Sequence, residues 1–66
     1  MQVRINGETQ QVDEGITLAG LIADLDLANR RIAVEINQTI VPRTRHAETP
    51  IRENDNIEII HAIGGG

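Results

Sequence analysis

Polar and apolar residues alternate at the start of the chain, over residues 2–6. Val3 and Ile5 alternate with polar residues, and after a break Thr9 to Val12 reads as the returning strand. That break is Asn6-Gly7, the residue pair that most strongly favours a two-residue hairpin turn. The pattern therefore predicts a β-hairpin over residues 2–13.

A helical pattern follows the hairpin. Its apolar residues recur at positions i, i+3, i+4 and i+7, namely Leu18, Leu21, Ile22 and Leu25. Thr17 can cap the first turn, and Ile16 is placed to pack on Leu21 as a hydrophobic staple. Gly20 inside the helix costs about 0.5–1 kcal/mol relative to alanine, which suggests that another backbone approaches there. We expect one helix with a single apolar stripe that faces the sheet.

The second half of the chain predicts further strands around a polar segment. In residues 32–36, large apolar residues alternate with Ala33 and Glu35, which predicts a strand. Residues 37–38 form a turn, and Ile40-Val41 is a short strand that ends before Pro42. Residues 43–56 are mostly polar, so we expect a loop with one buried residue, Ile51, and a turn at its end. Residues 57–63 read as the last strand.

The order of these elements is that of an α+β fold, the β-grasp, in which a mixed sheet of four to five strands curls around one helix. Connections this short leave few alternatives. We expect the domain to span residues 1–63, with the last strand central and next to the first. Ile57 and Ile59 then point to one face and Glu58 and Ile60 to the other, and residues 64–66 form a flexible glycine tail.

Composition narrows the class of protein. The core must come from eleven Ile, four Val, four Leu and some Ala, because there is no aromatic residue. The net charge of −4 disfavours nonspecific binding to nucleic acid or to an anionic membrane. Neither a signal peptide nor a membrane-length apolar run is visible, so we expect a cytoplasmic protein. Lysine and cysteine are absent, which excludes Schiff-base lysines, disulfides and thiolate metal sites.

Enzymatic interpretations find little support in the side chains. His46 and His61 are far apart and lack metal-ligand spacing, so no metal site is expected. The carboxylates fall at turns or on the solvent side of the helix, where charge runs are usually solvated. A domain of this size can hardly enclose the cleft that acid–base catalysis needs. We therefore expect no catalytic residue in this chain.

Three glycines, Gly64, Gly65 and Gly66, follow the last strand directly. One explanation is a frayed end without a role. The other is that the slim tail enters the active-site channel of a second protein, where the carboxylate of Gly66 reacts. A carboxylate becomes an acyl donor when it attacks the α-phosphorus of ATP to give a mixed anhydride, and this step requires no side chain of the carrier.

The whole chain resembles the ThiS family, the small ubiquitin-like sulfur carriers of bacterial thiamin biosynthesis. The resemblance rests on the short length, on the segments 36–43 (INQTIVPR) and 55–59 (DNIEI), and on the terminal diglycine. It implies that an E1-like partner uses ATP to adenylate Gly66, and that sulfur from a cysteine-derived persulfide replaces AMP to give a thiocarboxylate. Thiazole synthase would receive that sulfur, and the carrier itself would hold no cofactor.

The contact surface for these partners is expected near the tail. Ile60 beside Glu58 on the last strand suits a partner with a basic rim, and Arg43 is a further candidate. Single exposed apolar residues are nevertheless ordinary. Three other functions stay open at this point: a thiocarboxylate carrier for molybdopterin synthesis, a ubiquitin-like modifier of lysines, and a β-grasp interaction domain with an inert tail.

Overall fold

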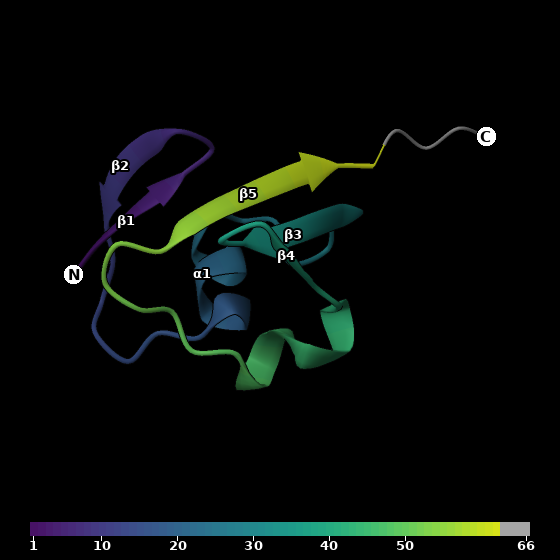
Figure 1. The fold of residues 1–66 in the computed structure, drawn as a ribbon. Helices are drawn as coiled ribbons and strands as arrows, with labels where there is room; N and C mark the ends of the chain where they lie inside the picture. Colours follow the sequence, from purple (N-terminus) through teal and green to yellow (C-terminus); the bar gives the residue numbers. More distant parts are fainter. Residues whose placement is uncertain (63–66) are drawn as a thin grey trace.

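A computed structural model describes residues 1–62 and shows the predicted β-grasp fold (Figure 1). Within this range the sheet has five strands in the order β2-β1-β5-β3-β4. In chain order the elements are β1 (Gln2–Ile5), β2 (Glu8–Gln11), α1 (Leu18–Asp24), β3 (Ile32–Ile36), β4 (Thr39–Val41), the 3₁₀ helix η1 (Arg43–Glu48) and β5 (Asn56–His61).

The last strand lies in the middle of the sheet, as predicted. β5 pairs with β1 in parallel, with Ile5 opposite Ile57. On its other side β5 pairs with β3 in antiparallel orientation over five residue pairs, from Ile36 opposite Ile57 to Ile32 opposite His61. A parallel pair needs a crossover connection, and almost the whole chain, including α1, lies between β1 and β5.

The hairpin and the helix begin where the residue patterns indicated. Asn6 and Gly7 have φ angles of 50° and 85°, the left-handed conformation that a tight hairpin turn requires. At the start of α1, the Thr17 hydroxyl accepts a hydrogen bond from the Gly20 N–H at 3.1 Å, as expected of a capping residue. Leu25 terminates the helix and is half-buried.

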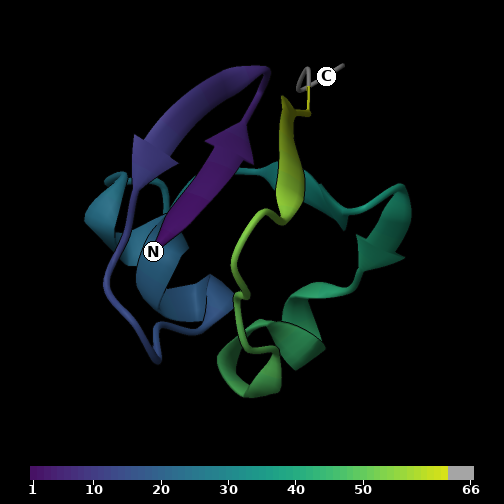
Figure 2. The ribbon, with the colours of Figure 1, turned by 60° about the vertical axis from the view of Figure 1, so that its left-hand side comes forward.

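The core lies between α1 and the face of the sheet that α1 covers. Its buried apolar residues are Val3, Ile5, Leu18, Leu21, Ile22, Val34, Ile51, Ile57 and Ile59. Figures 1 and 2 show α1 and η1 on the same side of the sheet, so no helix of the described residues covers the other face, which we call the uncovered face. Full burial of an aliphatic side chain contributes about 1.5–3 kcal/mol, and Ile57, which is fully buried, therefore helps to hold β5 in place.

Two local expectations were wrong. The close neighbour of Gly20 is not a backbone: a Cβ at this position would lie 3.1 Å from Cγ1 of the Ile16 side chain. Residues 43–56 are not only a loop with one buried residue, because η1 forms within them and His46 and Asp55 are buried as well. The His46 ring can be buried because its Nε2–H donates to the Val41 carbonyl oxygen at 3.0 Å.

Asp55 joins the two turns that flank the start of β5. One of its carboxylate oxygens accepts from the Asn37 side-chain amide at 2.9 Å, and the other accepts from the Arg52 N–H at 2.8 Å. The Asn37 side-chain oxygen accepts in turn from the Asn56 N–H at 2.9 Å. A buried carboxylate is stable in a fold only with such partners. This network therefore sets the position at which β5 enters the sheet.

We predict that Asp55→Ala lowers the free energy of unfolding by about 1–3 kcal/mol, because Asn37 and the Arg52 N–H lose their acceptor. Urea denaturation measures the change. Glu14→Ala is the matched control, since this carboxylate is exposed and should change stability by less than about 0.5 kcal/mol. Equal stability of the two variants would show that the network does not hold β5.

Candidate functional site

The predicted reacting end of the chain follows β5 after only a few residues. Gly64, Gly65 and Gly66 lie outside the described residues. The candidate site is therefore built from the strand that leads to them and from the surfaces on either side of that strand.

Hydrogen bonds fix the end of β5 on both flanks. On the β3 side, the Ala62 N–H donates to the Arg31 carbonyl oxygen at 2.9 Å. On the β1 side, the Asn6 N–H donates to the Ile57 carbonyl oxygen at 2.9 Å. The Asn6 side-chain oxygen then accepts from the Ile59 N–H at 2.8 Å. Asn6 thus extends the pairing of β5 beyond the end of β1.

Sequence reasoning identified Asn6 only as a turn residue. Its bond to Ile59 joins residues 53 positions apart. No local residue pattern predicts such a contact. The predicted pairing of the first strand with the last strand does, however, bring the hairpin turn near β5.

Glu58 and Ile60 lie on the uncovered face of the sheet, as predicted. Ile60 has 49% of its surface exposed, and Ile40 on β4 has 69% exposed. The strand register places Ala33 opposite Ile60 and Glu35 opposite both Glu58 and Ile40. These residues form the outer-face patch: Ala33, Glu35, Ile40, Glu58 and Ile60. The members of the patch on β3 and β4 were not predicted from the sequence. The alternation of residues 32–36 does place Ala33 and Glu35 on the side opposite to the buried Val34.

Two carboxylates face each other in the outer-face patch. Glu35 and Glu58 are direct cross-strand neighbours, and like charges in such positions destabilise a sheet. In the part of the chain that the structure describes, one ion pair is found: Arg45 Nε on η1 lies 3.2 Å from Glu48 Oε1. Neither glutamate of the patch is therefore neutralised by an ion pair within residues 1–62. A cationic group of a partner would relieve the repulsion, and the apolar neighbours would supply buried area.

Arg43 has contacts within the domain. Its Nη2 donates to the Arg30 carbonyl oxygen at 2.6 Å, and its Nη1 lies 3.5 Å from the Ala28 carbonyl oxygen. The guanidinium group therefore fastens the segment that precedes β3. The side chain is exposed, and its contact with a partner stays a prediction.

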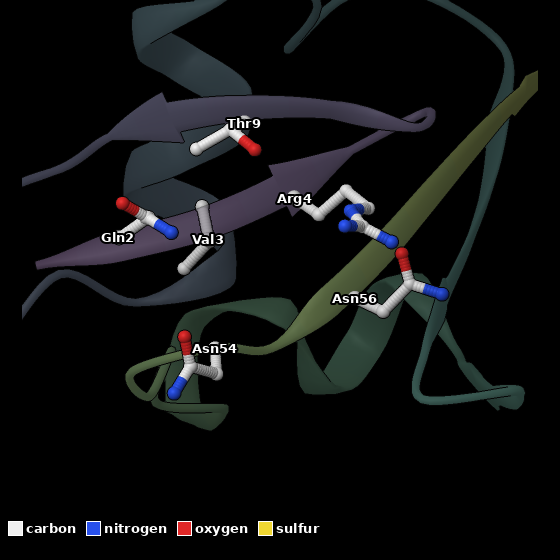
Figure 3. A pocket seen from close by; sticks show the side chains of 6 residues that line it. All are labelled: Gln2, Val3, Arg4, Thr9, Asn54 and Asn56. Atoms are coloured by element: carbon white, nitrogen blue, oxygen red, sulfur yellow. The ribbon is translucent and has the colours of Figure 1, made fainter.

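The hollow beside the β1–β2 hairpin and the turn before β5 does not gather catalytic groups. This hollow of about 250 Å³ is lined by Gln2, Val3, Arg4, Thr9, Asn54 and Asn56. Figure 3 shows the Arg4 side chain extended along the sheet towards Asn56. This lining contains one cation among amides and a hydroxyl, without a carboxylate or an imidazole that could exchange protons. Within residues 1–62, no group of three or more His, Cys, Asp or Glu side chains could hold a metal ion.

None of the helices in the described part of the chain is long and apolar enough to cross a membrane.

Comparisons with known proteins point to one family. The model of the ThiS family matches residues 3–66. The chain is 35% identical over 66 residues to the sulfur carrier protein ThiS of Escherichia coli, and the match covers 100% of both chains. A crystal structure of the thiamine biosynthesis protein ThiS from Geobacter metallireducens has a TM-score of 0.86 and 28% identity, again over 100% of both chains.

A larger protein contains a related segment. The chain is 39% identical over 66 residues to a thiazole synthase of Magnetococcus marinus. The match covers 100% of this chain but 20% of that protein, so the chain spans about a fifth of the length of that relative.

We predict that Asn6→Gly speeds amide hydrogen exchange at Ile59 and lowers the free energy of unfolding by about 1–3 kcal/mol. Glycine keeps the left-handed turn, so the change isolates the loss of the side-chain acceptor. The control is Gln38→Gly at another left-handed turn position, φ 71°, which should be neutral or stabilising. Unchanged exchange at Ile59 in the Asn6 variant would contradict the anchoring role of Asn6.

Proposed function

The chain belongs to the ThiS family, and we propose that it is a sulfur carrier of thiamin biosynthesis whose reacting group is the carboxylate of Gly66. The observation that carries the proposal is that the terminal glycines follow an anchored central strand of a β-grasp sheet. β5 is held on both flanks in the middle of the sheet, and the chain continues from it into three glycines that the family model includes.

In the proposed reaction, an oxygen of the Gly66 carboxylate attacks the α-phosphorus of ATP and pyrophosphate leaves. The product is an acyl adenylate, bound in the active site of an E1-like partner. Sulfur of a cysteine-derived persulfide then attacks the acyl carbon and AMP leaves. Cleavage of the resulting acyl disulfide by a thiol gives the thiocarboxylate. The partner binds the ATP, and the carrier contributes no catalytic side chain and no cofactor of its own.

The proposed recipient of the sulfur is thiazole synthase. Support comes from the thiazole synthase of Magnetococcus marinus, which contains a segment 39% identical to this chain. A transient carrier must also dissociate from each partner. Ordering glycine residues in a channel costs backbone entropy of about 1–2 kcal/mol per residue, so the folded body has to supply the offsetting contacts.

We propose that the outer-face patch supplies these contacts to the adenylating partner. Ile60 and Ile40 offer exposed apolar surface, and the facing pair of Glu35 and Glu58 fits a basic rim. The patch includes two residues of β5, the strand that leads to Gly64 and Gly65, so a partner bound there contacts the strand from which the tail leaves. Arg43 remains a weaker candidate because its guanidinium group is already engaged.

We predict that deletion of Gly66, or Gly65→Leu, abolishes growth of a thiamin-requiring strain that depends on this chain. Neither change touches the core, so the melting temperature should stay nearly the same. With ATP, the adenylating enzyme and a sulfur source, the intact mass of the unchanged chain should rise by the replacement of one oxygen with sulfur. Growth supported by the deletion variant would contradict the proposal, and conjugates to lysines in cell extract would identify a protein modifier instead.

We predict that Ile60→Arg raises the Kd for the adenylating enzyme at least about tenfold, which corresponds to ~1.4 kcal/mol, because a charge replaces the apolar centre of the contact. Isothermal titration calorimetry measures the Kd. Thr44→Arg on η1 adds the same charge at an exposed position away from the outer-face patch and should bind like the unchanged chain. Equal affinities of the two variants would remove Ile60 from the interface.

A further inference from the structure

β5 extends further than its parallel neighbour. β1 ends at Ile5 and the chain turns back at Asn6-Gly7, whereas β5 continues to His61. Figure 1 shows β5 passing the tip of the β1–β2 hairpin towards the C-terminus. The end of a strand in the centre of the sheet therefore lacks a neighbouring strand on one flank.

Two backbone groups on this flank lack partners within residues 1–62. Alternate residues of a strand direct their N–H and C=O groups to the same side. The Ile59 N–H points to the β1 side, where it reaches Asn6, and the Ala62 N–H points to the β3 side, where it reaches Arg31. The Ile59 C=O and the His61 N–H therefore face the β1 side. Within residues 1–62 no strand pairs with them and no hydrogen bond to them is found. We refer to these groups as the β5 edge.

A hollow of about 240 Å³ adjoins the β5 edge on the side of the sheet that α1 covers. Its apolar lining comes from Ile5, Ile59, Leu25 and Leu27, and its polar lining includes Glu8 and His61. Glu8 is the cross-strand partner of Ile5, so its side chain lies on the helix side. Its carboxylate is exposed and in no ion pair within residues 1–62.

An unpaired strand edge beside a side-chain pocket is the arrangement used in β-strand addition. In that mode of recognition, main-chain hydrogen bonds give affinity, and pockets for alternate side chains give specificity. The chemistry of this pocket favours a long basic side chain. Its aliphatic stem would cover Leu25 and Leu27, and its cationic head would reach Glu8. The net charge of −4 also favours a basic segment.

We propose that the β5 edge binds an extended segment of the adenylating partner, with an arginine or lysine of that segment in the hollow at Glu8. The inference rests on the proposed function, because it assigns a second contact to the same partner. His61 lies five residues before Gly66. A strand added here would continue the sheet towards the reacting residue and fix the direction in which the tail leaves the domain. The site is separate from the outer-face patch, which lies on the opposite face of the sheet.

The test compares Glu8→Lys with Glu14→Lys, two exposed glutamates that differ in their distance from the hollow. We expect Glu8→Lys to raise the Kd for the adenylating enzyme about tenfold, whereas Glu14→Lys should bind like the unchanged chain. Both should keep the melting temperature of the unchanged chain. Hydrogen exchange adds a backbone readout: exchange at the His61 amide should slow in the complex, and exchange at the Glu14 amide should not.

The outcomes separate this inference from the proposed function. If the unchanged chain releases pyrophosphate from ATP with the enzyme, but Glu8→Lys binds normally or His61 exchanges as in the free chain, the β5 edge is not the binding site. If the unchanged chain releases no pyrophosphate, the proposed function fails, and this inference fails with it.

Discussion

The pairing of β5 on both of its flanks is the constraint on which the rest of the structure depends. Its parallel neighbour β1 and its antiparallel neighbour β3 come from distant parts of the chain, and Ile57 of β5, which is paired with both, is fully buried. At the start of β5 the Asp55 network sets its entry, and near its end Asn6 and the Arg31 carbonyl hold Ile59 and Ala62. In the sequence, Gly66 follows the last residue of this anchored strand, His61, by five positions.

In this arrangement, the residues that stabilise the fold are different from the group that is proposed to react. The buried apolar residues lie between α1 and one face of the sheet, while the proposed reaction takes place at a backbone carboxylate outside that core. Under the proposed function, the carrier needs neither a cleft nor a catalytic side chain, because the partner would supply both. The facing glutamates of the outer-face patch are likewise explained by partner binding and not by stability. Their repulsion costs the free protein some stability, and binding to a basic partner would relieve it.

Much of the fold could be predicted from the sequence because its signals are local. Asn6-Gly7 specified the hairpin, the spacing from Leu18 to Leu25 specified α1, and alternation placed Glu58 and Ile60 on the uncovered face.

The features that sequence reasoning missed depend on tertiary contacts. Burial of His46 in η1 requires the Val41 carbonyl, and the role of Asn6 requires Ile59, 53 residues away. The expected backbone contact at Gly20 failed because a side chain, that of Ile16, fills this space. The candidate site was predictable as far as β5, whereas its members on β3 and β4 required the strand register.

The most direct test of the account is to compare the chain carrying a free Gly66 carboxylate with the same chain ending in a primary amide, prepared by peptide ligation. Both are incubated with ATP, the adenylating enzyme and a labelled sulfur source, and the label bound to each chain is measured. The account predicts that the free acid acquires sulfur and the amide acquires none, since the amide cannot form the acyl adenylate. Equal labelling of the amide would contradict the account and would place the reacting group elsewhere in the chain.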